Sequence, residues 1–220
     1  MNKFQIEKSK NFKNLRITGL IFLTLLFALL TWFVLTYPNL SWDQYVSAKL
    51  QSEKSEIFTV SMKALSFFGN VPYAFTAIVL TSAILYFYKK RREALLVLST
   101  VLTGIVSYIL KLLINRPRPT ADLVNIFEET TYKSFPSGHV LFYTVFFGFL
   151  AVIVFHADNI KKISKRVLIF LFIVLVMLGA TSRIYLGSHW FTDILGGLII
   201  GLQFVIIGEF YYSKKRFSES

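Results

Sequence analysis

Residues 17–37 read ITGLIFLTLLFALLTWFVLTY, a stretch without a single charged side chain. An α-helix of this length crosses about 30 Å of hydrocarbon, the thickness of a bilayer core. The basic residues before it are also typical of a secretory signal. No small-residue cleavage pattern follows, however, because the next residues are Pro38, Asn39 and Leu40. The stretch therefore predicts a retained first transmembrane helix.

The rest of the chain repeats this pattern. Of the 220 residues, 55% are hydrophobic and only 16% are charged, which is less charge than soluble domains carry. The predicted fold is therefore an all-α polytopic membrane bundle forming a single domain over residues 1–220, with its motif-bearing core at about 94–212. Its six predicted transmembrane helices lie at roughly 17–37, 72–88, 94–113, 140–157, 167–183 and 192–212.

The segment between the first two spans has a different character. Residues 40–70 interleave apolar and polar side chains, which predicts an amphipathic helix lying in the membrane interface. Gly69 and Asn70 end this helix, and Pro72 suits the first turn of the next one.

The basic residues predict the orientation, because Lys and Arg concentrate in cytoplasmic loops. Six spans place both termini, the 2–3 loop and the 4–5 loop on one side, and these segments hold sixteen of the 24 basic residues. That side is predicted to be cytoplasmic, in a cell (plasma) membrane. The sixteen are Lys3, Lys8, Lys10, Lys13 and Arg16, then Lys89, Lys90, Arg91 and Arg92, then Lys161, Lys162, Lys165 and Arg166, and finally Lys214, Lys215 and Arg216.

Composition also excludes some functions. The net charge of +12 is explained by membrane topology, since the basic residues lie between apolar runs and not on a polar surface that could bind nucleic acid. The chain has no cysteine, which excludes disulfides, thiolate metal sites and a cysteine nucleophile. Glu128 and Glu129 lack metal-ligand spacing and are predicted to be solvated. No metal or cofactor is expected, and the sequence does not indicate an oligomeric state.

Three unusual clusters fall in the outward segments. KLLINRPRP runs from Lys111 to Pro119, PSGH from Pro136 to His139, and SRIYLGSHWFTD from Ser182 to Asp193. Each alone has an ordinary interpretation, as a topology signal, a helix start or a packing pair. The topology, inferred only from the inner charges, nevertheless places all three at one membrane face. Their convergence predicts a site there.

The cations of this site predict its ligand. Charges near bilayer depth are costly and usually functional, and Lys111, Arg118 and Arg183 together suit a phosphate dianion. The two prolines of the first cluster break its helix, so we expect Arg116 and Arg118 to turn toward a common point. Ser137 and Gly138 open the fourth span, where free backbone N–H groups bind anions.

The histidines predict turnover. His189 and Asp193 are four residues apart, which predicts one helical face. A carboxylate behind an imidazole fixes its tautomer and stabilises its cationic form, as nucleophile or base activation requires. His139 is then left to protonate the leaving group.

The three clusters together resemble the type-2 phosphatidic acid phosphatase (lipid phosphate phosphatase) superfamily, whose pattern is Lys-x6-Arg-Pro, Pro-Ser-Gly-His and Ser-Arg-x5-His-x3-Asp. The resemblance implies a helical bundle and a metal-independent phosphatase that forms a phosphohistidine. It assigns nucleophilic attack to His189, orientation of that ring to Asp193 and general acid catalysis to His139. It assigns the phosphate oxygens to a larger set: Lys111, Arg118, Ser137, Gly138, Ser182 and Arg183.

Several alternatives stay open at this stage. A lipid or anion transporter would also use buried cations, but it would not need a nucleophile and a proton donor. A phosphotransferase would pass the phosphate to an alcohol. Among membrane lipid phosphates, undecaprenyl diphosphate ranks first as substrate, because the small chain suits a bacterial member acting at the outer face. Phosphatidylglycerol phosphate, with phosphatidic acid, ranks second.

Overall fold

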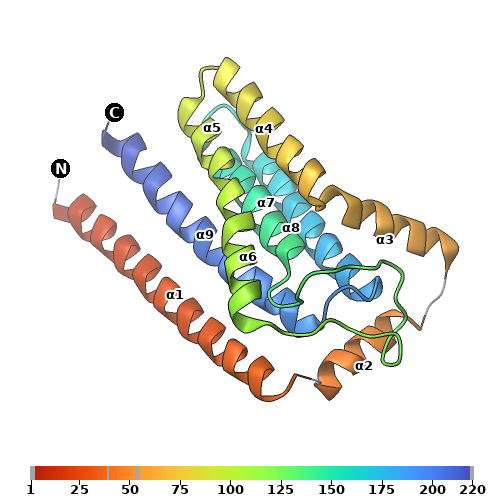
Figure 1. The fold of residues 1–220 in the computed structure, drawn as a ribbon. Coiled ribbons are helices and arrows are strands. Elements are labelled where there is room, and N and C mark those ends of the chain that lie inside the picture. Colours follow the sequence, from red (N-terminus) through yellow and green to blue (C-terminus); the bar gives the residue numbers. More distant parts are fainter. Residues whose placement is uncertain (1–2, 39, 53–54, 219–220) are drawn as a thin grey trace.

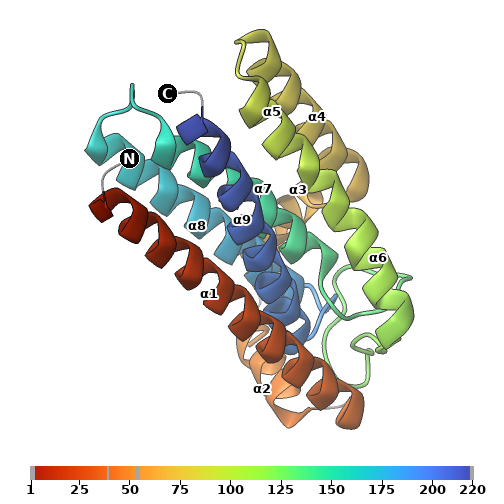
Figure 2. The ribbon, with the colours of Figure 1, turned by 90° about the vertical axis from the view of Figure 1, so that its left-hand side faces the viewer.

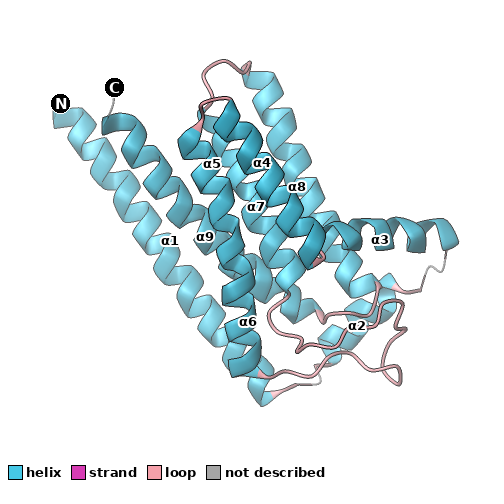
Figure 3. Ribbon diagram, turned by 45° about the horizontal axis from the view of Figure 1, so that its top comes forward, coloured by secondary structure: helices cyan, strands magenta, loops and turns pink. Residues whose placement is uncertain are grey.

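The structure is a computed structural model that describes residues 3–38, 40–52 and 55–218, with side chains described for 12–38, 40–52 and 55–213. The basic side chains at positions 3, 8, 10 and 214–216, which entered the orientation prediction, lie outside this range. Within it, all regular secondary structure is helical (Figure 3). The elements are α1 (Lys3–Thr36), α2 (Ser41–Leu50), α3 (Glu56–Phe68), α4 (Val71–Phe87), α5 (Arg91–Leu98), the 3-10 turn η1 (Ser99–Val101), α6 (Leu102–Ile114), α7 (Gly138–His156), α8 (Lys162–Tyr185) and α9 (Phe191–Ser218).

The predicted all-α polytopic bundle is confirmed. Five helical segments in the described part of the chain are long and apolar enough to cross a membrane alone: Phe12–Thr36, Arg91–Ile114, Gly138–His156, Lys162–Tyr185 and Phe191–Ser213. The second predicted span corresponds to α4, which has 17 residues. It is long enough to cross a membrane only when it is taken together with α3. These two helices are bent by 59° at their junction, and counting the pair as one broken span gives the predicted six.

The predicted interfacial helix over 40–70 is wrong in one respect, because two helices, α2 and α3, occupy this segment. Residues 51–55 read QSEKS and offer no apolar side chain to bury. Helix α2 ends just before Gln51. The side-chain amide of Gln51 donates to the carbonyls of Asn125 (2.8 Å) and Tyr185 (2.7 Å). The predicted break at Gly69 and Asn70 is confirmed, and Pro72 does lie in the first turn of α4.

Helix α7 is the centre of the bundle. It packs against α8 and α9, and 56% of its most apolar stretch is buried, against 6% for α1. Its own aromatic side chains, among them Phe142, Phe146 and Phe149, are buried against the neighbouring helices. Since lipid offers little hydrophobic drive for helix association, such packing contacts hold the bundle together. Helix α1 lies along α9 at the edge and presents most of its surface outward (Figures 1 and 2).

The bundle has two distinct ends. Both chain ends and the turns between α4 and α5 and between α7 and α8 lie at one end (Figures 1 and 2). The opposite end carries α2, the link between α8 and α9, and the long loop between α6 and α7. All four basic segments of the orientation prediction therefore share one end, and the three sequence clusters share the other.

Candidate active site

The three clusters meet at the second end of the bundle. Lys111 lies in the last turn of α6, and Arg183 in the last turn of α8. The PSGH cluster forms the start of α7, and Asp193 lies in the first turn of α9. A backbone hydrogen bond from Ser137 N–H to the Asp193 carbonyl (3.0 Å) joins the starts of these two helices. Sequence distance separates the clusters, and helix packing brings them together.

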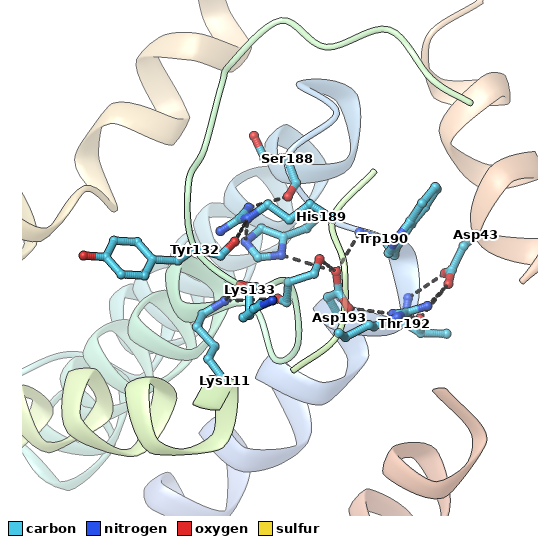
Figure 4. A network of polar contacts seen from close by, with 12 residues as sticks. Asp43, Lys111, Tyr132, Lys133, Ser188, His189, Trp190, Thr192 and Asp193 are labelled. Atoms are coloured by element: carbon cyan, nitrogen blue, oxygen red, sulfur yellow. Dashed lines mark hydrogen bonds and ion pairs between the residues drawn. The ribbon is translucent and has the colours of Figure 1, made fainter. Parts of the chain in front are cut away.

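Asp193 is the hub of the polar network in Figure 4. It is fully buried, and its Oδ2 accepts the backbone N–H of Trp190 (2.8 Å) and a very short hydrogen bond from Ser134 Oγ. Its Oδ1 accepts a charged hydrogen bond from Arg116 Nη1 (2.6 Å). His189 Nδ1 lies 3.3 Å from Oδ2. The carboxylate is thus fixed by several donors and faces the imidazole.

His189 contacts Asp193 as predicted but not as two residues on one helical face. It precedes α9 and belongs to the link from α8, so the contact depends on the turn before the helix. Because an ionised carboxylate only accepts hydrogen bonds, Nδ1 carries the proton and Nε2 carries the free lone pair. Nε2 lies 3.4 Å from Arg118 Nη1. The lone pair therefore points toward the cationic part of the site.

The surroundings keep this imidazole neutral. Burial is the largest cause that holds the pKa of His189 well below its ordinary value of 6.5, and the Arg118 cation is the next. Burial also lowers the pKa of Arg118, to about 10, so this guanidinium stays charged at neutral pH. A neutral imidazole beside a cation is chemically able to attack an anionic phosphorus centre held by that cation.

The two arginines of the first cluster do not share a target, contrary to prediction. Arg118 donates to the carbonyls of Ser188 (2.5 Å) and Tyr132 on the His189 side. Arg116 turns the other way and is buried between the carboxylates of Asp193 and Asp43. The left-handed conformation of Asn115, with φ 52°, ends α6 ahead of the prolines, and the two side chains beyond it bind different partners. Arg118 alone of the two faces the predicted phosphate site.

Lys111 faces the same region as Arg118. Its Nζ donates to the carbonyls of Lys133 (2.5 Å) and Ser134 (3.1 Å), which belong to the loop over the site. Figure 4 shows its ammonium group on the same side of the network as the His189 ring.

The prediction that Glu128 is solvated is wrong, because this residue pairs with Arg183. This carboxylate is not simply solvated, because its Oε2 accepts from Arg183 Nη1 (2.9 Å) and from Ser66 Oγ (2.8 Å). The side chain of Glu128 is 27% exposed and that of Arg183 only 1%. Glu129 is exposed, as predicted. The loop between α6 and α7 is thereby tied to α8 and, through Ser66, to α3.

The remaining predicted residues lie around the start of α7. Ser137 is fully buried, and its hydroxyl makes no hydrogen bond within the described part of the chain. Gly138 is the first residue of α7. Ser182 donates its hydroxyl to the Gly179 carbonyl (2.7 Å), which leaves only its acceptor side for other contacts. His139 Nε2 lies 3.0 Å from the Asn70 side-chain oxygen.

Sequence reasoning missed several residues that the structure connects to the site. Asp43 and Ser134 bind Arg116 and Asp193, and Asn70 contacts His139. Arg116 lies within the first cluster, so the sequence indicated that it belongs to the site. The sequence did not indicate that its partners differ from those of Arg118. Asp43 and Asn70 lie far from the clusters in sequence, and nothing in their neighbourhood marks them.

No group of three or more His, Cys, Asp or Glu side chains in the described residues is arranged to hold an ion. Lys111, Arg118 and Arg183 are cations that lie near His189.

The chain is similar in sequence to known proteins. The family model described as PAP2 superfamily matches residues 92–217. Phosphatidylglycerophosphatase B of Bacillus subtilis (strain 168) is 33% identical over 161 residues, which cover 72% of this chain and 77% of that protein. Undecaprenyl-diphosphatase BcrC of the same organism is 29% identical over 153 residues, covering 67% of this chain and 70% of that protein.

A solved structure has a similar fold. The crystal structure of a transmembrane PAP2 type phosphatidylglycerolphosphate phosphatase from Bacillus subtilis superposes with a TM-score of 0.80 at 26% identity. The match covers 89% of this chain and 96% of that one. The similarity extends beyond the family match at residues 92–217, since it takes in most of the chain.

Proposed function

The chain belongs to the PAP2 superfamily, and on that premise we propose that it is a metal-independent lipid phosphatase with a histidine nucleophile. Phosphatidylglycerol phosphate takes first place as substrate, because the relative named for it has the higher identity and coverage. This reverses the order predicted from sequence, which placed undecaprenyl diphosphate first. The diphosphate becomes the second candidate, supported by the similarity to BcrC.

The observation that carries the mechanism is the pairing of His189 with Asp193. The ring is buried, its Nδ1 lies 3.3 Å from Oδ2 of Asp193, and its Nε2 lies near Arg118. In the first step Nε2 attacks phosphorus, and the bond from phosphorus to the lipid oxygen breaks. Asp193 stabilises the positive charge that forms on the ring. The departing lipid oxygen takes a proton from His139.

A second step regenerates the enzyme. Water attacks the phosphorus of the phosphohistidine while His139 accepts a proton from that water. The bond from phosphorus to Nε2 breaks, and inorganic phosphate leaves. His139 thus acts first as acid and then as base, which returns both histidines to their starting states.

The phosphate oxygens are assigned to donors around His189. Lys111, Arg118 and Arg183 supply three cations, and such fixed charges stabilise developing negative charge better than water can. The unpaired hydroxyl of Ser137 and the N–H of Gly138 at the start of α7 add neutral donors. Ser182 is the weakest of the predicted contacts, since its hydroxyl already donates within α8.

We place this site on the extracytoplasmic side, with both termini in the cytoplasm. Support comes from the bundle itself, because the segments rich in Lys and Arg lie at the end opposite the site (Figure 1). Basic segments are retained on the cytoplasmic side during insertion.

Purified protein in detergent tests the proposal. Wild type should release phosphate from phosphatidylglycerol phosphate, more slowly from undecaprenyl diphosphate, and also from nitrophenyl phosphate. His189→Ala should abolish all three activities. His139→Ala should impair the lipid monoester most and nitrophenyl phosphate least, because nitrophenolate leaves without a proton. The exposed Asp122 supplies a control, Asp122→Asn, that should match wild type.

The alternatives predict other results. A folded His189→Ala protein with undiminished hydrolysis would overturn the nucleophile assignment. Lipid binding by wild type without hydrolysis of any substrate would favour a transporter. A phosphotransferase would incorporate little oxygen from labelled water into phosphate and would need an added alcohol.

A further inference from the structure

A second set of buried charges lies behind the His189–Asp193 pair. Arg116 is 2% exposed and Asp43 is fully buried. Arg116 Nη1 lies 2.6 Å from Asp193 Oδ1, and its Nη2 lies 2.8 Å from Asp43 Oδ2. One guanidinium therefore bridges two carboxylates, one on α9 and one on α2. Asp43 lies outside residues 92–217, the part matched by the family model.

Asp43 also holds the start of α9 directly. Its Oδ1 accepts the backbone N–H of Thr192 (2.9 Å), and its Oδ2 accepts the Thr192 hydroxyl (2.7 Å). A carboxylate on a free N–H at a helix N-terminus both caps the helix and opposes its dipole. Figure 4 shows Asp43 and Thr192 on the side of Asp193 that faces away from His189. The α2 helix thus reaches the turn that positions the nucleophile.

The charges in this set do not balance. Asp43, Arg116 and Asp193 together carry one net negative charge. Arg116 with Asp193 alone would be neutral, and would oppose positive charge on His189 only weakly. A second carboxylate on the far side of the guanidinium offsets its charge, so the negative charge of Asp193 remains available to the ring. Buried ion pairs of this kind are often no more stabilising than apolar side chains of similar volume, which argues for a role beyond stability.

We propose that Asp43 and Arg116 are positioning residues that set the orientation and the effective charge of Asp193 behind the nucleophile. This inference rests on the proposed function, because it assumes that His189 becomes positively charged during phosphoryl transfer. Arg116 acts by geometry, since its fork holds Oδ1 so that Oδ2 faces His189. Asp43 acts by charge and by fixing the first turn of α9. Neither touches the substrate.

Other charged groups also face His189 and influence its protonation. Arg118 approaches from the loop between α6 and α7, Lys111 from α6 and Arg183 from α8, and all three disfavour a cationic ring. Asp193 approaches from α9, and His139 from α7. A change at Asp43 or Arg116 leaves these groups in place and alters the charge behind Asp193, so its effect on the titration of His189 has a defined sign.

The pH dependence of kcat/KM with nitrophenyl phosphate separates positioning from simple stability. Its acid limb, the fall in kcat/KM at low pH, reports the loss of the neutral, attacking form of His189. His139 contributes little to this limb, because nitrophenolate leaves without a proton. Asp43→Asn removes negative charge and should move the limb to lower pH, with kcat falling about 10- to 100-fold. Arg116→Gln removes positive charge and should move the limb to higher pH. Arg116→Lys keeps the charge and loses the fork, so kcat should fall while the limb stays in place.

Controls make each outcome decisive. Asp122→Asn removes an exposed carboxylate from the same end of the bundle and should leave both kcat and the limb unchanged. The double variant Asp43→Asn with Arg116→Gln restores the net charge, so its limb should return toward the wild-type position while kcat stays low. Thermal unfolding and size-exclusion chromatography in detergent establish that each variant is folded.

Three results would overturn the proposal. The first is a folded Asp43→Asn enzyme with wild-type kcat and an unmoved limb. The second is a shift of the limb in the same direction for Asp43→Asn and Arg116→Gln. The third is loss of folding in both Asp43→Asn and Arg116→Lys, which would assign the set to stability. If His189→Ala kept full activity, the proposed function itself would fail, and this outcome is distinct from the other three.

Discussion

Replacing Gly197 by alanine tests whether close contact between α9 and the start of α7 sets the geometry of the site. A Cβ at this position would lie 2.7 Å from the carbonyl oxygen of Ser137 and 3.2 Å from the Leu141 backbone nitrogen. Both atoms belong to backbone, so no side-chain rotation can relieve the clash. Restoring ordinary contact at 3.4 Å requires a separation of about 0.7 Å, which must come from moving one helix against the other.

The cost in stability should be modest. Alanine gains about 0.5–1 kcal/mol over glycine in a helix interior, and overpacking typically costs about 1–3 kcal/mol. The free energy of unfolding should therefore fall by roughly 0–2.5 kcal/mol, the difference of these two ranges. Activity should fall more, because the N–H of Ser137 bonds to the Asp193 carbonyl. Since a misplacement of about 1 Å can cost about 10²-fold in rate, we expect at least a tenfold loss in kcat.

Gly104→Ala is the matched control, because a Cβ at Gly104 in α6 would meet nothing within 4 Å. It makes the same chemical change in a membrane helix and should leave kcat unaltered and stability equal or slightly higher. Thermal unfolding in detergent and initial rates on nitrophenyl phosphate give both quantities. If Gly197→Ala matched Gly104→Ala in both, the close approach would not control the site, and the reasoning would be refuted.

Three further predictions concern topology, pH and metals. In intact cells, a membrane-impermeant thiol reagent should label Asp122→Cys and not Lys90→Cys; the reverse pattern would place the site in the cytoplasm. The acid limb of kcat/KM for nitrophenyl phosphate should lie below pH 6.5, because burial and Arg118 lower the pKa of His189 and the neutral ring attacks. A limb above that value would contradict a neutral resting nucleophile. Chelators should leave phosphate release unchanged, since fixed cations supply the charge stabilisation; loss of activity that added magnesium restores would show a metal requirement.

The parts of the fold that sequence predicted well are those set by local composition. An uncharged run such as residues 17–37 has few alternatives to a transmembrane helix, and α1 confirms it. The second span, 72–88, was harder, because α4 has only 17 residues and is joined to α3 across a bend of 59°. The split of 40–70 into α2 and α3 depends on Gln51, whose partners lie more than seventy positions away.

The site shows the same division. Lys111, Arg118 and His189 could be predicted because their residue types and spacing are distinctive within short segments. Glu128 was misjudged, because it lies in a loop and its partner Arg183 comes from α8, 55 positions away. The role of Asp43 could not be predicted from its neighbours in sequence, because its contact with Thr192 joins residues 149 positions apart. Such contacts follow from helix packing, which a single sequence does not display.

Capture of the phosphoenzyme tests the histidine mechanism directly. Purified wild type would be mixed with substrate labelled in the transferred phosphate, quenched rapidly without acid, and digested for mass spectrometry. The histidine mechanism predicts an acid-labile, alkali-stable phosphate on His189, present in wild type and absent from His189→Ala. His139→Ala with nitrophenyl phosphate should accumulate more of it, because release of the phosphate needs His139 as a base. Active enzyme that never carries label on His189, or that carries it on another residue, would contradict the account.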